Sequence, residues 1–278
     1  MIRIKNEIFV GSDGRKSLVD ITIPENFNHK IIFFVHGYKG YKDWGPWNEI
    51  EKRFVLNGFA FVKFNLTHNG GTIENPIDFP DLEAFSENTY SKEIHDIETI
   101  LRDFRLNFQE TWNDSKKILI GHSRGGGDVI LAAAKNQEFL DGIVTWAAIA
   151  DIEERFPSGE ELRKWEKEGV MYVENARTHQ QMPHKFSFYT DFQENMDQLN
   201  IQSAARKIHI PWLIVHGDQD LAVTLDNAER LKDWSNADLQ IIKGANHTFN
   251  TAHPFEAKVF EKQTQELIDV TLSFLNSL

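Results

Sequence analysis

The sequence predicts an α/β fold, with a mostly parallel central sheet of about eight strands and helices on both faces. Two observations carry this prediction. Short apolar runs alternate with segments of helical spacing, and central runs such as residues 31–35 are apolar at every position. Strands that are apolar throughout are typical of a parallel sheet covered on both faces. One domain with an insertion therefore describes these 278 residues better than two equal domains.

The predicted elements follow one another in a regular order. Alternating runs at residues 2–10 and 17–24 flank a turn-rich stretch and predict an antiparallel hairpin at a sheet edge. Further strands are predicted at residues 31–35, 59–64, 116–120, 142–149, 211–215 and 238–242. Helices are predicted at residues 47–56, 89–108, 128–135 and 255–275. These helices supply the right-handed crossovers that parallel strands need.

Two segments interrupt the alternation. Residues 67–88 are rich in Asn, Gly, Pro and Asp and predict a long loop, a feature that is often functional in compact domains. Residues 151–200 are first charged and helical and then aromatic and loop-like. We interpret residues 151–204 as a lid, called the insertion below, and residues 1–150 and 205–278 as the core.

Composition excludes several classes of function. A net charge of −12 disfavours nucleic acid and anionic membranes as partners. The chain has no cysteine, which excludes disulfides, thiolate metal sites and a cysteine nucleophile. His179 and His184 lie five residues apart without a clear third ligand, so no metal site is predicted. Because residues 1–6 lack the features of a signal peptide and no apolar run approaches a membrane span, we expect a cytoplasmic protein.

The candidate nucleophile lies in the sequence Gly121-His122-Ser123-Arg124-Gly125, between a predicted strand and a predicted helix. A serine at such a junction occupies a tight, strained turn that exposes its hydroxyl above the sheet edge. Glycines two positions before and after are needed because side chains there would clash with the neighbouring elements.

A serine hydroxyl needs a base within hydrogen-bond reach, and the base needs an acid to orient it. His247 follows the last predicted strand and is the candidate base. Asp220 follows the preceding strand and is the candidate acid, with Asp218 and, less favoured, Asp151 as alternatives. All of these positions follow strand ends, where ligands bind in open α/β sheets.

The chain resembles an α/β-hydrolase-fold serine hydrolase. The resemblance rests on Gly-His-Ser-Arg-Gly at 121–125, His-Gly-x-x-Asp-x-x-Val at 216–223, Gly-Ala-x-His at 244–247 and Phe-Val-His-Gly-Tyr at 34–38. It covers about residues 30–250 and has the nucleophile, acid, histidine order of that family. It implies that Ser123 is the nucleophile, His247 the base and Asp220 the acid. The backbone N–H groups of Tyr38 and Arg124 would form the oxyanion hole.

Other side chains near these motifs have two interpretations each. His36 and His216 are expected to brace loops by hydrogen bonding, and His122 is expected to serve packing. The Arg124 side chain either pairs with an acidic residue or faces the substrate pocket. Aromatic residues of the insertion either line that pocket or form the insertion's own core; Trp165, Phe188 and Tyr189 are the candidate pocket residues.

The leading hypothesis is a serine hydrolase that cleaves a small-molecule ester or related acyl bond through an acyl-enzyme, with no metal or organic cofactor. A serine aminopeptidase is the first alternative, for which Glu153, Glu154, Glu160 and Glu161 would form the amine-binding cluster. An acyltransferase and a non-catalytic ligand-binding protein of the same fold also remain. Dehalogenase and epoxide-hydrolase chemistry is disfavoured because such relatives carry aspartate at the nucleophile position. Substrate identity and oligomeric state are not specified by these patterns.

Overall fold

Eight strands form the central sheet of the computed structural model, which describes residues 1–257 and 259–278. The strands are β1 (Ile2–Val10), β2 (Lys16–Ile23), β4 (Ala60–Phe64), β3 (Lys30–Val35), β5 (Lys116–His122), β6 (Gly142–Trp146), β9 (Trp212–Gly217) and β10 (Asp238–Ile242), in their order across the sheet. β2 pairs antiparallel with both β1 and β4, and every other pairing is parallel. The predicted fold class, including the edge hairpin, is confirmed.

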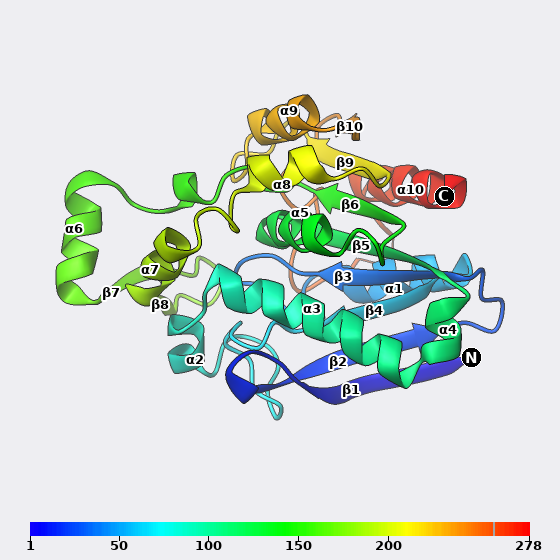
Figure 1. Ribbon diagram of the computed structural model, residues 1–278, viewed down its shortest axis with the longest axis horizontal. Helices are drawn as coiled ribbons and strands as arrows, with labels where there is room; N and C mark the ends of the chain where they lie inside the picture. Colours follow the sequence, from blue (N-terminus) through cyan, green and yellow to red (C-terminus); the bar gives the residue numbers. More distant parts are fainter. Residues whose placement is uncertain (258) are drawn as a thin grey trace.

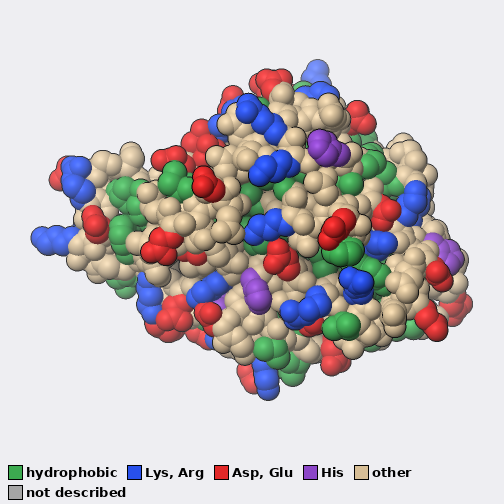
Figure 2. All heavy atoms as spheres, in the orientation of Figure 1, with side chains coloured by type: hydrophobic (Ala, Val, Ile, Leu, Met, Phe, Trp, Pro, Cys, Tyr) green, Lys and Arg blue, Asp and Glu red, His purple; other side chains and the backbone are tan. Residues whose placement is uncertain are grey.

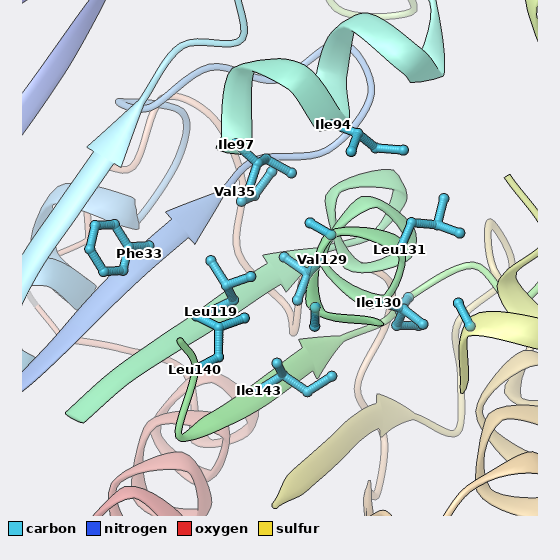
Figure 3. Close-up of a cluster of buried hydrophobic side chains, with 14 of the residues drawn as sticks. Phe33, Val35, Ile94, Ile97, Leu119, Val129, Ile130, Leu131, Leu140 and Ile143 are labelled. Atoms are coloured by element: carbon cyan, nitrogen blue, oxygen red, sulfur yellow. The ribbon is translucent and has the colours of Figure 1, made fainter. Parts of the chain in front are cut away.

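Helices cover both faces of this sheet (Figure 1). One face carries α3 (Tyr90–Asn107), α5 (Arg124–Asn136), α8 (Ile201–Lys207) and α9 (Leu225–Trp234), and the other carries α1 (Trp47–Leu56) and α10 (Lys262–Ser277). Figure 3 shows Phe33 and Val35 of β3 on the α3 and α5 side, together with Ile97 and Val129. Ile32 and Phe34 belong to the apolar cluster of the opposite face. This burial on both sides explains why the strand is apolar at every position.

Several predicted boundaries differ from the structure. β6 ends at Trp146 rather than residue 149, because Ala147 has a φ of 48°, outside the extended region. α5 begins at Arg124, four residues before its predicted start. α10 begins at Lys262 rather than residue 255, and Phe255 and Phe260 stack on each other before it. α4 (Gln109–Asn113), α8 and α9 are additional helices.

The insertion contains more regular structure than its sequence predicts. It holds the 3₁₀ turn η2 (Glu153–Arg155), α6 (Gly159–Glu168), the antiparallel pair β7 (Val170–Glu174) and β8 (Gln181–Lys185), and α7 (Ser187–Glu194). The stretch expected to be loop-like is therefore a strand and a helix. Phe156, Trp165, Phe188 and Phe192 supply the physical reason, because their rings pack together and bury Trp165 of α6 and one side of α7. In Figure 1 these elements project beyond the end of the sheet toward which β3 points.

The long loop after β4 supports the insertion. It contains α2 (Leu82–Ser86), which packs against β8. Phe79 and Phe85 of this loop form an apolar cluster with Tyr41 and with Met182 of β8. The first residues of α8 fall within the insertion by sequence, yet α8 packs on α5 of the core. Among the described residues, no helix is long and apolar enough to cross a membrane.

Candidate active site

Ser123 occupies a strained turn between β5 and α5. Its φ of 59° and ψ of −121° are unusual for a residue with a side chain. Its N–H donates to the carbonyl of Trp146, 2.8 Å away, which ties the turn to the neighbouring strand. A Cβ at Gly121 would lie 2.2 Å from the carbonyl oxygen of Gly125, and one at Gly125 would lie 2.3 Å from that of His36. The two glycines therefore meet the steric requirement inferred from the sequence.

The structure brings Ser123, His247 and Asp220 together in one hydrogen-bonded chain. His247 Nε2 lies 2.9 Å from Ser123 Oγ, and His247 Nδ1 lies 2.8 Å from Asp220 Oδ2. The other two candidate acids face elsewhere. Asp218 accepts the N–H of Gly244, and Asp151 accepts backbone N–H groups of the 3₁₀ turn η2. Asp220 is thus the carboxylate that orients the histidine.

Asp220 is held in its charged form. Its burial acts to raise the pKa, but hydrogen bonds from His216 and His247 outweigh that effect, and the pKa lies well below its usual range. Its Oδ1 also accepts the N–H groups of Ala222 and Val223, each at 2.9 Å. A carboxylate fixed in this way keeps the proton on His247 Nδ1, which leaves Nε2 free to accept a proton from Ser123.

Two further histidines hold the loops around this chain. His122 Nε2 donates to the backbone carbonyl of His247 at 2.9 Å, and burial together with the nearby His247 lowers the pKa of His122 to about 3. His36 Nδ1 donates to the Gly37 carbonyl, while its Nε2 accepts the Leu66 N–H. Burial lowers the pKa of His36 to about 4. Both side chains are therefore neutral near neutral pH; His36 braces a loop as expected from the sequence, whereas His122, expected to serve packing, also makes a hydrogen bond.

Two backbone donors flank Ser123. Arg124 is the first residue of α5, and the first N–H groups of a helix have no acceptor within the helix. Tyr38 follows Gly37, where an added Cβ would lie 2.9 Å from Ser123 Cβ, so this loop passes directly beside the serine. Among the described residues, neither N–H donates to a protein acceptor outside regular elements. Both are available to hydrogen-bond an oxyanion formed at Ser123.

A cavity of about 450 Å³ opens beside Ser123 and His247. Trp165 and Phe188 of the insertion line it, as expected. Tyr189 differs from the expectation: it lies outside the cavity lining and packs against Phe156 and Phe186 instead. Tyr189 is one residue further along α7 than Phe188 and so lies on a different side of the helix.

Other lining residues were not anticipated from the sequence. They are Lys39, Tyr90, Arg155, Phe156 and His184, among others. Lys39 directly follows Tyr38, the predicted oxyanion residue, and this position is the one sequence feature that could have indicated that Lys39 lines the cavity. The Tyr38 hydroxyl lies 2.7 Å from His184 Nε2, which links the loop after β3 to β8 of the insertion. Residues 67–88, the long loop predicted from the sequence, do not line the cavity.

A second, smaller cavity of about 130 Å³ also borders Ser123 and His247. It shares Ser123, His247, Tyr38 and Lys39 with the large cavity, and its remaining lining includes Trp44, Trp47, His122 and Thr248. A molecule attached to Ser123 would therefore have space in two directions.

The Arg124 side chain meets both expectations at once. It lines the large cavity, and its Nη1 lies 3.5 Å from Glu93 Oε1.

The four glutamates that would bind a substrate amine in an aminopeptidase do not lie at the cavity. Glu153, Glu154, Glu160 and Glu161 are exposed and lie outside the cavity lining, and Glu154 pairs with Arg230. They form a solvated surface rather than a binding cluster.

Comparison with known proteins places the chain in a family. Est1E from Butyrivibrio proteoclasticus is similar, with a TM-score of 0.69, 19% identity and 99% of each chain covered. The esterase domain of a Rhodothermus marinus protein has a TM-score of 0.65 and 15% identity, covering 99% of this chain and 98% of that one. A monoacylglycerol lipase from Paleococcus ferrophilus has a TM-score of 0.67 and 16% identity, covering 94% and 98%. No curated protein sequence matches the chain. The alpha/beta hydrolase family model matches residues 32–258, and the chain belongs to that family.

Proposed function

We propose that the protein is a serine hydrolase that cleaves a carboxylic ester, or a related acyl bond, of a small molecule. Membership of the alpha/beta hydrolase family supports a hydrolase. The observation that carries the finer proposal is the continuous chain from Ser123 through His247 to Asp220, with both links below 3 Å. Nucleophile and base at this distance are the geometry that activates a serine hydroxyl.

In the proposed reaction, Ser123 Oγ attacks the ester carbonyl carbon while His247 Nε2 takes the hydroxyl proton. The N–H groups of Tyr38 and Arg124 donate to the resulting oxyanion, and the positive end of α5 adds to this stabilisation. The tetrahedral intermediate collapses, and the alcohol leaves with the proton from His247. Water, deprotonated by His247, then attacks the acyl-enzyme, and the acid is released with Ser123 restored. None of these steps requires a metal or an organic cofactor.

The two cavities support an ester substrate, because one has room for the acyl part and the other for the alcohol part. We propose that the insertion, residues 151–204, acts as the lid that shapes the larger one. An aminopeptidase is disfavoured, because a substrate amine needs a carboxylate partner, and the described lining of the large cavity contains no Asp or Glu. Proteins of similar fold include the Rhodothermus marinus esterase domain and the Paleococcus ferrophilus monoacylglycerol lipase.

Turnover of p-nitrophenyl butyrate tests the proposal. Ser123→Ala should lower kcat by about 10³-fold or more, because the nucleophile is lost while the binding surfaces remain. Ser277→Ala, an exposed serine at the end of α10, is the matched control and should keep full activity. A fluorophosphonate should label Ser123 in the folded protein. Undiminished activity in Ser123→Ala, or no labelling of wild type, would favour a ligand-binding protein without chemistry.

A further inference from the structure

The large cavity differs in charge from the molecule around it. The protein has a net charge of −12, and on the face shown in Figure 2 acidic and basic side chains are interspersed. The cavity instead is lined by the cations Lys39, Arg124 and Arg155, and its described lining includes no Asp or Glu. A cavity with one sign of charge and largely apolar walls concentrates ligands of the opposite sign.

Arg124 is the unusual member of this group, because it is buried and poorly paired. Its exposure is 9%, and its guanidinium lies over the rings of Tyr38, Tyr90 and Phe188 at 4.2, 5.0 and 5.1 Å. A guanidinium has five N–H donors. Among the described residues its one recorded acceptor is Glu93 Oε1, at a long 3.5 Å. That oxygen already accepts the amide of Asn88 at 2.6 Å.

The carboxyl groups behind Arg124 do not supply the missing acceptors. Glu93 Oε2 and both oxygens of Asp128 are buried and lack other partners. Burial and then the nearby Glu93 raise the pKa of Asp128 well above its ordinary value. Asp128 is thereby favoured in its neutral form, in which it does not balance the charge of Arg124.

Lys39 adds a second cation that has no carboxylate partner. Its Nζ donates to the backbone carbonyl of Glu174 and lies 5.1 Å from the centre of the Tyr38 ring. Burial, and then repulsion from Arg124, lower the pKa of Lys39. Arg155 is different, because it already bonds the Ala222 carbonyl and the Asn227 side chain. Arg155 is also exposed, whereas Arg124 and Lys39 are more buried, so these two cations are the better placed to bind a ligand inside the cavity.

We propose that the substrate ester carries a carboxylate group that lies in the large cavity beside Arg124 and Lys39. The planar fork of a guanidinium matches a carboxylate, and a site with unpaired buried donors rejects a neutral analogue. This inference rests on the proposed ester hydrolysis. It narrows the substrate class to anionic esters, such as half-esters of dicarboxylic acids or esters of a hydroxy acid.

Matched esters test the inference from either end of the substrate. On the acyl side, p-nitrophenyl hydrogen adipate is compared with the p-nitrophenyl ester of adipamic acid, which replaces the carboxylate by a neutral amide. On the alcohol side, 3-carboxyphenyl butyrate is compared with 3-carbamoylphenyl butyrate. After subtraction of spontaneous hydrolysis, kcat/KM should favour the anionic member about tenfold or more in one series. That series identifies the part of the ester that occupies the cavity.

Substitutions of the two cations test the residues involved. Arg124→Gln should reduce the preference about tenfold or more, and Lys39→Gln should reduce it less, because Lys39 is less buried. Arg124→Lys, which keeps the charge but loses the fork, should restore part of the preference. Lys116→Gln removes a cation at the opposite end of β5 from Ser123 and should leave the preference unchanged. Since the readout is a ratio within each variant, a general loss of activity does not affect it.

Binding without turnover separates the two proposals. The Ser123→Ala protein should bind the anionic ester at least about tenfold more tightly than its neutral partner by calorimetry, whether or not the ester is a substrate. Equal turnover in both series together with equal binding would overturn the inference and leave the proposed function intact. Tighter binding of the anionic ester with no Ser123-dependent hydrolysis would support the anion site and overturn the proposed function.

Discussion

At the scale of single residues, two neighbouring aspartates show how position decides a role. Asp218 and Asp220 lie in the same loop after β9, but Asp218 accepts the Gly244 N–H while Asp220 bonds His247. Asp220→Asn should lower kcat for p-nitrophenyl butyrate by about 10³ to 10⁴-fold, because an amide N–H at this position favours the wrong histidine tautomer. Asp218→Asn is the matched control and should change kcat little. Equal losses in the two variants would contradict the assignment.

His122 contributes a pH dependence to stability. The pKa of His122 is about 3 in the folded protein, below its ordinary 6.5, so between these values the unfolded chain binds a proton that the folded chain does not. The contribution of neutral His122 to the free energy of unfolding is therefore fully present above about pH 6.5 and is lost as the pH falls. His122→Gln keeps a donor for the His247 carbonyl but does not titrate.

Urea unfolding of wild type and His122→Gln at several pH values measures this effect. Between about pH 6 and pH 4, the unfolding free energy of wild type should fall faster than that of the variant, by about 1.4 kcal/mol per pH unit. Parallel pH profiles would show that His122 does not resist protonation in the fold.

At the scale of elements, α5 is positioned by the lack of a side chain at Gly125 on its first turn. A Cβ at Gly125 would lie 2.3 Å from a backbone oxygen, whereas one at Gly127 would meet side-chain carbons of Ile149 and Ile201 at 2.8 and 3.1 Å. Gly125→Ala should therefore cost about 3 kcal/mol or more, because the helix must move away from β3. Gly127→Ala should change stability by about 1 kcal/mol or less, since the gain in helix propensity offsets the crowding.

Chemical denaturation and p-nitrophenyl butyrate turnover of these two variants provide the measurement. Gly125→Ala should also lose activity, because α5 carries the Arg124 N–H and sets the position of Ser123. A Gly125→Ala protein as stable and active as the Gly127→Ala protein would contradict this account of the elbow.

The elements that sequence patterns predicted well are those whose burial repeats along the chain. β3, β4, β5 and β9 lie within about two residues of their predicted bounds because both of their faces pack against helices. The predictions failed between residues 170 and 194, where burial depends on a small aromatic cluster within the insertion. The predicted start of α10 failed for a related reason, since Phe255 and Phe260 pack on each other outside any helix.

At the scale of the whole molecule, the insertion and the core differ in how deeply they are buried. α6 buries the single residue Trp165, whereas most of α5 is buried. Backbone hydrogen bonds in α6 should therefore open at lower free energy than those in α5.

Hydrogen exchange followed by mass spectrometry tests this difference. Peptides covering residues 159–168 should exchange much faster than peptides covering residues 124–136, and an anionic ester bound to Ser123→Ala protein should slow the former. Equal protection of both segments would contradict a lid that opens separately from the core.

The sequence by itself determined the fold class and the turn that carries Ser123. Apolar runs specify strands buried on both faces, and the spacing of Gly121, Ser123 and Gly125 specifies a turn whose steric requirements lie within a few residues. The positions of the predicted strand ends then indicated His247 and Asp220 as partners of Ser123, with Asp218 as an alternative acid.

Only the tertiary structure decided the rest, because it depends on contacts between distant residues and on side-chain direction. Asp220 and not Asp218 points at His247. Arg124 meets Glu93, 31 residues away, with one long contact, and shares the cavity with Lys39 and residues of the insertion. No periodicity or spacing encodes how many donors of a buried guanidinium remain unpaired. That number follows from the packing of three separate segments, and it carries the inference about the substrate.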